Sequence, residues 1–179
     1  MKFRSGGERL KVVVMSDSHG CNKELEYVME KEKNTDLWLH CGDICVPSHA
    51  YMKVVVVRGN NDLYNYPIER IINVPGHRIL MLHSHTLPFM AREEALLQRA
   101  KENKCDIVLY GHTHIPYLKK IDGITILNPG SLYHNRDGSD ISYAVMRLDE
   151  AFLDVKIKYI EEDIYQPDPM DWIRKHRNG

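Results

Sequence analysis

Short apolar runs separated by polar segments dominate the first two-thirds of the chain. Runs rich in valine, isoleucine and leucine that are too short for helices suit strands buried on both faces. They predict strands at 12–15, 36–41, 53–58, 68–74, 77–82 and 106–110. Apolar residues recur at helical spacing in two other segments, which predicts helices over 22–33, with Asn22 as the N-cap, and over 91–104. Strands and helices therefore alternate in this part of the chain.

The last third of the pattern is rich in strands. Strands are predicted at 117–121, 124–127, 142–148 and 152–160. Asp122-Gly123 and Pro75-Gly76 are turn signals that predict hairpins between the strands that flank them. The whole pattern favours an α/β (α+β) fold, with two packed mixed sheets and helices outside them. We expect one domain over residues 11–162, after a polar leader (1–10) and before a charged, proline-bearing tail (163–179).

Composition narrows the function classes. The chain has 179 residues with 43% hydrophobic residues and a net charge of -1, so one sizeable core is expected and no basic field favours a stable nucleic acid complex. The apolar runs are strand-sized, so no membrane span is expected. The N-terminus lacks the apolar stretch of a signal peptide, which favours a cytoplasmic protein. The four cysteines are irregularly spaced and are interpreted as reduced thiols, mostly small buried residues: Cys21, Cys41, Cys45 and Cys105.

Polar side chains follow five of the predicted strands at the point where each strand ends. They are Asp17 and His19, Asp43, Asn60, His83, and His112 and His114. In open α/β sheets, ligands gather at the carboxyl ends of the strands. Carboxylates, a carboxamide and imidazoles suit two divalent ions that share a carboxylate. Each donor alone would equally fit an exposed loop residue, but five in succession favour a metal centre, whereas His40, inside a strand, is interpreted as structural.

The donors belong to a series of six short sequence motifs that follow one another along the chain. They are D-x-H at Asp17–His19, G-D at Gly42-Asp43, G-N-x-D at Gly59–Asp62, H-x-H at His83–His85, G-H-x-H at Gly111–His114 and N-P-G-S at Asn128–Ser131. As a set they are highly specific. The chain resembles the calcineurin-like metallophosphoesterase superfamily, and more narrowly its small single-domain prokaryotic phosphodiesterases.

The resemblance implies a four-layer αββα sandwich with a binuclear metal centre. It implies that Asp17, His19 and His114 hold a first ion, that Asn60, His83 and His112 hold a second, and that Asp43 bridges them. Manganese is the metal expected from the family, with iron, nickel, zinc or magnesium as substitutes. Two such ions would activate a hydroxide for attack on phosphorus and offset the charge that grows on the phosphoryl oxygens.

Two positions depart from the family pattern. Asn61 stands where many members have a histidine that serves as general acid, which predicts weak turnover of substrates with poor leaving groups. His85 could supply the missing proton, or could have a structural or substrate-binding role. Ser84 stands where glycine is common and could narrow the pocket or donate to a ligand. The candidate catalytic residues are thus Asn60, Asp62 and His85, with Arg58 and His134 as phosphate contacts or plain surface cations.

The function expected is hydrolysis of a small phosphodiester, such as a cyclic nucleotide, a nucleotide-like diester or a lipid head group. Two alternatives stay open. One is a non-catalytic scaffold of the same fold that binds a protein partner, as in a eukaryotic retromer subunit. The other is a phosphomonoesterase, which the missing histidine disfavours. Homo-oligomers are compatible with the sequence.

Overall fold

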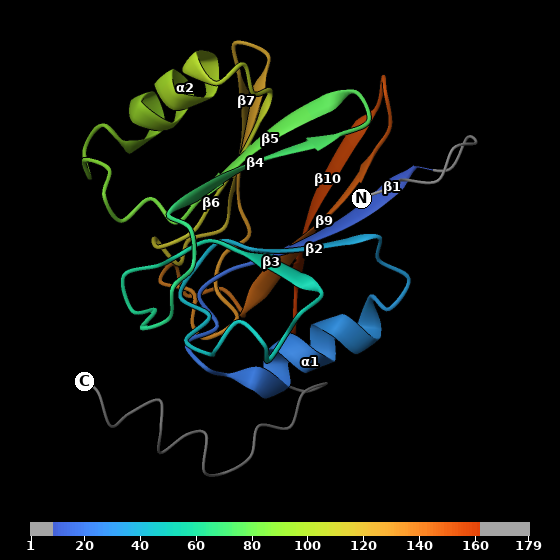
Figure 1. Cartoon of the computed structure of the whole chain (residues 1–179), viewed down its shortest axis with the longest axis vertical. Helices are drawn as coiled ribbons and strands as arrows, with labels where there is room; N and C mark the ends of the chain where they lie inside the picture. The colour runs from blue at the N-terminus through green and yellow to red at the C-terminus, as the bar shows by residue number, and fades with distance from the viewer. Residues whose placement is uncertain (1–8, 162–179) are drawn as a thin grey trace.

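Two five-stranded sheets form the centre of the molecule in a computed structural model that describes residues 9–161 (Figure 1). The first sheet has the order β10-β9-β1-β2-β3 and the second the order β4-β5-β6-β8-β7. The strands of the first sheet are β1 (Leu10–Met15), β2 (Leu37–His40), β3 (Val54–Val56), β9 (Ser142–Leu148) and β10 (Leu153–Tyr159). Those of the second are β4 (Glu69–Val74), β5 (His77–Leu82), β6 (Ile107–Tyr110), β7 (Tyr117–Ile121) and β8 (Ile124–Asn128).

Both sheets are mixed, with parallel strands at the positions that matter for the site. β1, β2 and β3 are parallel, as are β5, β6 and β8, while β9, β10, β4 and β7 pair antiparallel with their neighbours. Parallel neighbours end at the same edge of their sheet. The segments that leave β1, β2, β3, β5 and β6 therefore meet at one end of the sandwich.

The layers are held by three apolar clusters. Alternate residues of both sheets, such as Val12, Val14, Ile79 and Met81, fill the space between them. The other face of the first sheet packs on α1 (Asn22–Lys31) through residues that include Leu25 and Val28. The outer face of the second sheet packs on α2 (Arg92–Glu102) through Leu96 and Ala100. The predicted four-layer αββα sandwich is therefore confirmed, with one helix on each outer face of the described chain.

Local boundaries differ modestly from those predicted. Both helices are shorter than expected, and Asn22 is not the N-cap of α1 as predicted: Cys21 holds that position, without a side-chain hydrogen bond. The hairpin at Asp122-Gly123 is confirmed, since both residues have positive φ (51° and 82°), as a two-residue turn of the strand-joining type requires. β1 starts at Leu10, the last residue of the predicted leader; residues 1–8 of that leader and the tail 163–179 lie outside the described residues.

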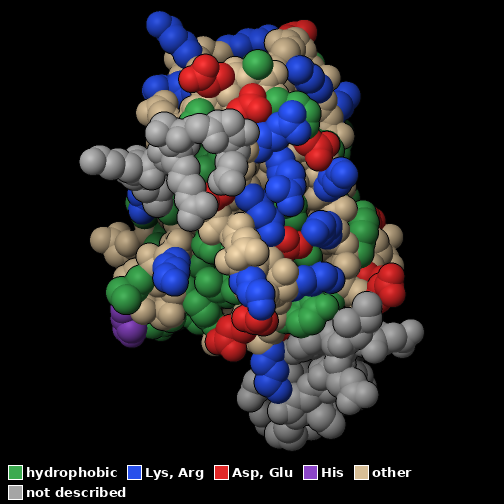
Figure 2. All heavy atoms as spheres, turned by 90° about the vertical axis from the view of Figure 1, so that its right-hand side faces the viewer, with side chains coloured by type: hydrophobic (Ala, Val, Ile, Leu, Met, Phe, Trp, Pro, Cys, Tyr) green, Lys and Arg blue, Asp and Glu red, His purple; other side chains and the backbone are tan. Residues whose placement is uncertain are grey.

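No helix within residues 9–161 is long and apolar enough to cross a membrane. The face on the right of Figure 1 carries a band of lysine and arginine side chains (Figure 2). Many described cations have carboxylate partners: Lys11 and Lys158 both pair with Glu32, at 2.6 Å each. Such compensation agrees with the near-zero net charge of the chain.

Candidate metal centre

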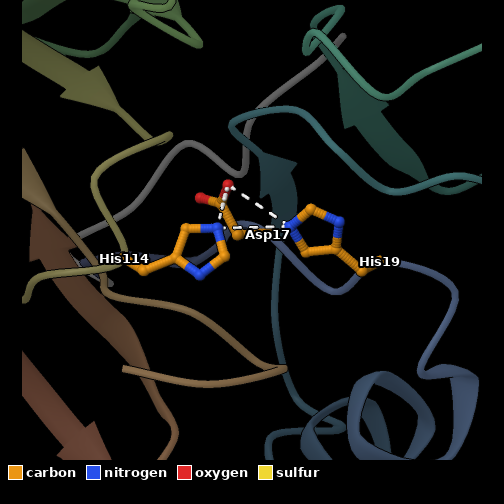
Figure 3. Close-up of side chains that lie close together, drawn as sticks. All are labelled: Asp17, His19 and His114. Atoms are coloured by element: carbon orange, nitrogen blue, oxygen red, sulfur yellow. Dashed lines mark hydrogen bonds and ion pairs between the residues drawn. The ribbon is translucent and has the colours of Figure 1, made fainter. Parts of the chain in front are cut away.

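The strand ends bring side chains from both sheets to one place. Asp17 and His19 lie directly after β1, Asp43 after β2 and His83 after β5, while His112 and His114 follow β6. The first of two groups of metal-ligand type is Asp17, His19 and His114 (Figure 3). Asp17 Oδ1 lies 3.1 Å from His114 Nε2, and the Nε2 atoms of His114 and His19 are 3.2 Å apart. The two imidazoles thus approach one carboxylate from opposite sides.

The second group is Asp17, Asp43 and His83. His83 Nε2 lies 3.3 Å from Asp43 Oδ2 and 3.8 Å from Asp17 Oδ1. The side-chain oxygen of Asn60 is 3.2 Å from the same nitrogen. Asp43 Oδ2 is also 3.8 Å from His19 Nε2. Asp43 therefore lies between the two groups, the place that a bridging ligand would occupy.

His112 lies beside these groups and belongs to neither of them. Its ring centroid is 5.2 Å from that of His83, and its backbone N–H donates to Asp17 Oδ2 at 3.0 Å. Burial and the positive charges of His83 and Arg92 lower the pKa of His112 to about 4. The imidazole is therefore neutral near pH 7, the form that can ligate a metal.

The hydrogen bonds around the centre fit a cation. The Nδ1 atoms of His83 and His114 must donate to the backbone carbonyls of Cys41 (2.8 Å) and His134 (3.0 Å), because a carbonyl only accepts. In the neutral rings Nε2 is then a bare acceptor, and both Nε2 atoms face Asp17 Oδ1. That oxygen is buried and has no hydrogen-bond donor. Converging acceptors repel unless a cation lies between them, so the residues present suit divalent metal ions.

The carboxylates are held ionised. Burial alone would raise the pKa of Asp17, but the close contact with His114 and the proximity of His83 outweigh it, so the pKa is lowered. For Asp43 the same competition between burial and its contacts to His83 and Asn61 also ends in a lowered pKa. Burial lowers the pKa of His83, yet the two carboxylates raise it by more. The site thus concentrates negative charge that attracts a positive partner.

Comparison with known proteins agrees with this geometry. The model of the calcineurin-like phosphoesterase superfamily domain matches residues 10–151. The chain belongs to the calcineurin-like phosphoesterase superfamily. It is 31% identical over 144 residues to the probable metallophosphoesterase YsnB of Bacillus subtilis, which covers 78% of this chain and 85% of the relative. A crystal structure of a predicted phosphoesterase from Streptococcus pneumoniae is similar at a TM-score of 0.78 with 29% identity, over 86% of this chain and 91% of that one.

More distant similarities lead to proteins with different roles. The phosphodiesterase MJ0936 of Methanocaldococcus jannaschii is 24% identical over 144 residues, or 68% of this chain and 83% of the relative. Vacuolar protein sorting 29 of Cryptosporidium parvum shares the fold at a TM-score of 0.67 with 18% identity, over 85% of this chain and 98% of that one. The superfamily implies divalent metal ions, and Asp17, Asp43 and the imidazoles around them are the candidates for holding them.

Residues between the superfamily motifs position the candidate ligands. Asp62 is buried, and its oxygens accept the backbone N–H groups of Gly59, Asp43 and Cys45 at 2.7–2.9 Å. Both oxygens of Asp62 therefore accept backbone donors that fix neighbouring loops, and its predicted catalytic role stays a prediction. Ser84 donates to the carbonyl of Gly111 at 3.1 Å, so its hydroxyl tethers the loop that carries His112.

The backbone at the centre has an unusual conformation that sequence reasoning missed. Five of the candidate ligands have positive φ: Asp17 (53°), His19 (47°), Asp43 (56°), His112 (76°) and His114 (56°). For L-residues other than glycine this conformation costs about 1–2 kcal/mol each. Strain of this kind clusters at functional sites, where it aims side chains that an ordinary turn would not. The glycines directly beside His19, Asp43 and His112 are the nearest signal in the sequence.

Close packing explains the glycines. A Cβ at Gly42 would lie 2.7 Å from His83 Nδ1, and a Cβ at Gly59 or Gly111 would collide with Asp43 or Ser16. His40 is buried and belongs to neither group of metal-ligand type: its Nε2 lies 3.1 Å from the Ser18 hydroxyl, its Nδ1 has no hydrogen-bond partner, and burial lowers its pKa to about 3. The four cysteines, all within the described residues, form no disulfide with one another; Cys41 and Cys105 are buried as expected, while Cys21 and Cys45 are partly exposed.

Proposed function

We propose that the protein is a phosphodiesterase that hydrolyses small phosphodiesters with two divalent metal ions, manganese by preference. The observation that carries this proposal is the convergence of the Asp17 and Asp43 carboxylates with the bare Nε2 atoms of His83 and His114. Two bound divalent cations would lower the pKa of water and withdraw charge from phosphoryl oxygens. Iron, nickel, zinc and magnesium are the alternatives to manganese, and elemental analysis of the purified protein would distinguish them.

Each residue has a defined part in this proposal. Asp17, His19 and His114 would hold one ion, Asn60, His83 and His112 the other, and Asp43 would lie between them. Asn60 is exposed, so its carboxamide can offer the oxygen to an ion while the NH₂ group donates to a phosphoryl oxygen. Asp62 fixes the loops of Asp43 and Asn60, and His85 stays the candidate for protonating the leaving group.

A diester is favoured over a monoester by Asn61. The residue at this position cannot protonate a leaving oxygen near neutral pH, so the reaction should depend on leaving groups that depart as stable anions. A relative that is named a phosphodiesterase supports the same class. A cytoplasmic location and assembly into homo-oligomers stay predictions.

The test pairs activity with metal content. Purified protein is stripped with chelator, reloaded with one divalent metal at a time and assayed with bis-p-nitrophenyl phosphate and with p-nitrophenyl phosphate. We expect manganese to restore hydrolysis, a faster diester than monoester rate, and two metal ions per chain by elemental analysis. A faster monoester rate would instead favour a phosphomonoesterase.

The second candidate is a protein-binding scaffold, because a vacuolar protein sorting 29 structure has the same fold. Acceptor atoms from six of the seven predicted ligands lie within 4.0 Å of another member of the set, and the seventh, His112, contacts His83 edge-on. A scaffold has no need of such an arrangement. Folded protein that binds metal yet hydrolyses neither ester with any divalent ion would favour the scaffold.

A further inference from the structure

The connection between β8 and β9 crosses from the second sheet to the first beside the metal centre. β8 runs parallel to β6 and β9 antiparallel to β1, so β8 ends and β9 begins at the end of the sandwich where β1 and β6 end. Asp17 and His19 follow β1, and His114 follows β6. The connection, which begins with the N-P-G-S motif, therefore passes between the two strand exits that supply the residues proposed to hold the first ion.

Ser131, the last residue of that motif, ties the connection to the exit of β1. Its hydroxyl donates to the backbone carbonyl of Asp17 at 2.8 Å and accepts the backbone N–H groups of Tyr133 and His134 at 2.9 and 3.0 Å. A hydroxyl has one proton and two lone pairs, so every hydrogen-bonding position of this buried side chain is used. These bonds fix the two following residues relative to Asp17.

Tyr133 and His134 contact the two imidazoles of the same group. The ring of Tyr133 lies against that of His19, with centroids 5.5 Å apart and the planes tilted by 58°. The backbone carbonyl of His134 accepts the Nδ1–H of His114 at 3.0 Å. A ligating imidazole is usually oriented by such an acceptor at its other nitrogen. Within residues 9–161, Nδ1 of His19 forms no hydrogen bond, so the orientation of that ring depends on its contacts with Tyr133 and His114.

Asn135 holds this segment in place. Its buried side-chain oxygen accepts the backbone N–H of Ser131 at 2.7 Å, and its amide group donates to the carbonyl of Asp140 and to the hydroxyl of Ser142. A Cβ at Gly130, which has φ of 82°, would collide with that same hydroxyl. The turn is therefore fixed by side-chain bonds and close packing, and its two contacts with the imidazoles are built on a rigid base.

The residues proposed for the second ion have other neighbours. In the described part of the chain, no hydrogen bond or ring contact joins Asn60, His83 or His112 to residues 131–135. Asp17 lies near both groups, so the bond from Ser131 bears on both. The contacts made by Tyr133 and by the His134 carbonyl bear on the first group alone.

We propose that residues 131–135 are a brace that orients the ligands of the first ion, with Ser131, Tyr133 and Asn135 as positioning residues. The inference rests on the two-ion site of the proposed function, but it concerns metal affinity and not hydrolysis. Loss of a group that orients a metal ligand typically lowers metal affinity by about 10–100-fold. The brace therefore sets the affinity of the first ion separately from that of the second.

Manganese titration of metal-stripped protein, followed by calorimetry, tests the brace. Wild type is expected to bind two ions. Tyr133→Leu removes the ring beside His19 and keeps the backbone bonds, so one affinity should fall about tenfold while the other keeps its wild-type value. Tyr133→Phe is the matched control: it keeps the ring and should keep both affinities. Ser131→Ala loosens the whole turn and should lower the same affinity by at least as much as Tyr133→Leu.

Asn60→Ala identifies which ion responds. Asn60 is proposed for the second ion alone, so its loss should lower the other affinity, and Asn60→Ala combined with Tyr133→Leu should lower both. The brace is overturned if both substitutions lower the same affinity, if Tyr133→Leu lowers both equally, as a general loss of structure would, or if it changes neither.

Failure of the proposed function has a different signature. Two manganese sites that respond as expected in a protein without hydrolytic activity support the brace and count against the enzyme. A single manganese site in wild type refutes the two-ion function. The brace then depends on that site: an affinity that Tyr133→Leu lowers and Tyr133→Phe preserves supports it, and an affinity that Tyr133→Leu leaves unchanged overturns it. Protein that binds no divalent metal overturns both proposals.

Discussion

Asn61 donates twice to Asp43: its backbone N–H to Oδ1 and its side-chain amide to Oδ2, each at 2.7 Å. The position at which many superfamily members have a histidine is thus used here to hold the carboxylate proposed to bridge the metal ions. Burial would raise the pKa of Asp43, and these two bonds, together with His83, reverse the shift. The departure from the family pattern therefore has a structural consequence besides the loss of an acid.

Asn61→Ala should weaken metal binding. It removes the side-chain donor and keeps the backbone one, so Asp43 loses part of its orientation. Hydrogen-bond partners of ligating groups typically contribute about 10–100-fold in metal affinity, and we expect a loss in that range for manganese by titration calorimetry. Asn103→Ala is the matched control, because the Asn103 amide bonds to the Arg99 carbonyl at the end of α2. Equal manganese affinity in all three proteins would contradict the role of Asn61.

Asp17→Asn should abolish the stabilisation of the protein by metal. The wild type is expected to gain about 2.7 kcal/mol at a manganese concentration 100 times the dissociation constant. For a domain of this size that gain raises Tm by roughly 5–10 °C. The variant keeps the shape of the side chain but loses its charge, so its Tm should not respond to manganese.

The metal-free proteins provide an independent check. The lowered pKa of Asp17 means that its charge stabilises the metal-free fold at pH 7, so neutralising it should cost stability. We therefore expect metal-free Asp17→Asn to melt below metal-free wild type in a calorimetric scan. Asp149→Asn, which affects a surface pair with Arg9, should keep the full response to manganese. A wild-type Tm that no divalent metal changes would refute the metal centre.

Most of the architecture could be predicted from the sequence because the strands are marked by short apolar runs. Val12–Met15 and Ile107–Tyr110 are continuous apolar runs, as strands covered on both faces require. The donors could be located at the strand ends because each follows such a run directly. Helix ends were less predictable: Asn22 has the chemistry of a cap, yet the chain after Gly20 turns so that Cys21 takes that place.

Contacts across the two sheets could not be predicted from one chain. Nothing local to Ser84 or Asn61 indicates that they bond to Gly111 and Asp43, which follow other strands. The sequence predicts only that Arg92 lies near the start of a helix. Its electrostatic effect on His112 depends on how α2 packs on the second sheet. Positive φ at Asp17 and His114 likewise could not be predicted, since few residues other than glycine adopt it and no local motif marks these two.

The rate of hydrolysis should depend steeply on the leaving group. Asn61 is bound to Asp43, and burial together with the charge of His83 lowers the pKa of His85, so at pH 7 few molecules carry a proton donor there. We expect aryl diesters to react at least 100-fold faster than alkyl diesters, on the order of the usual gain from general acid catalysis. The measurement is kcat/KM for a series of diesters with manganese.

His85→Ala separates the two roles left open for His85. If it donates the proton, the variant loses activity with alkyl diesters selectively and the dependence on leaving group becomes steeper. If His85 orients the substrate, aryl and alkyl rates fall by the same factor. An equally fast reaction of alkyl and aryl diesters in the wild type, with a difference only in the variant, would identify His85 as the acid.

Part of the loss of stability in acid should come from the protonation of Glu32, at the end of α1. Its buried carboxylate receives Lys11, Lys158 and the Tyr143 hydroxyl. Burial would raise the pKa of Glu32, but these partners lower it from 4.5 to about 2. Because the folded pKa is the lower one, the stabilisation is complete above about pH 4.5 and is lost as the pH falls toward 2.

Glu32→Gln should therefore destabilise the protein at pH 7 and matter less in acid. Removing one partner of a buried ion pair costs about 3–5 kcal/mol, and since the Lys158 side chain is 41% exposed we expect about 2 kcal/mol here. Urea unfolding of both proteins from pH 7 to pH 2.5 measures the difference, which should shrink below pH 4.5. Glu30→Gln, in an exposed pair with Lys33, should change stability by less than about 0.5 kcal/mol at any pH. A difference for Glu32→Gln that stays constant with pH would show that the carboxylate is stabilised by packing and not by charge.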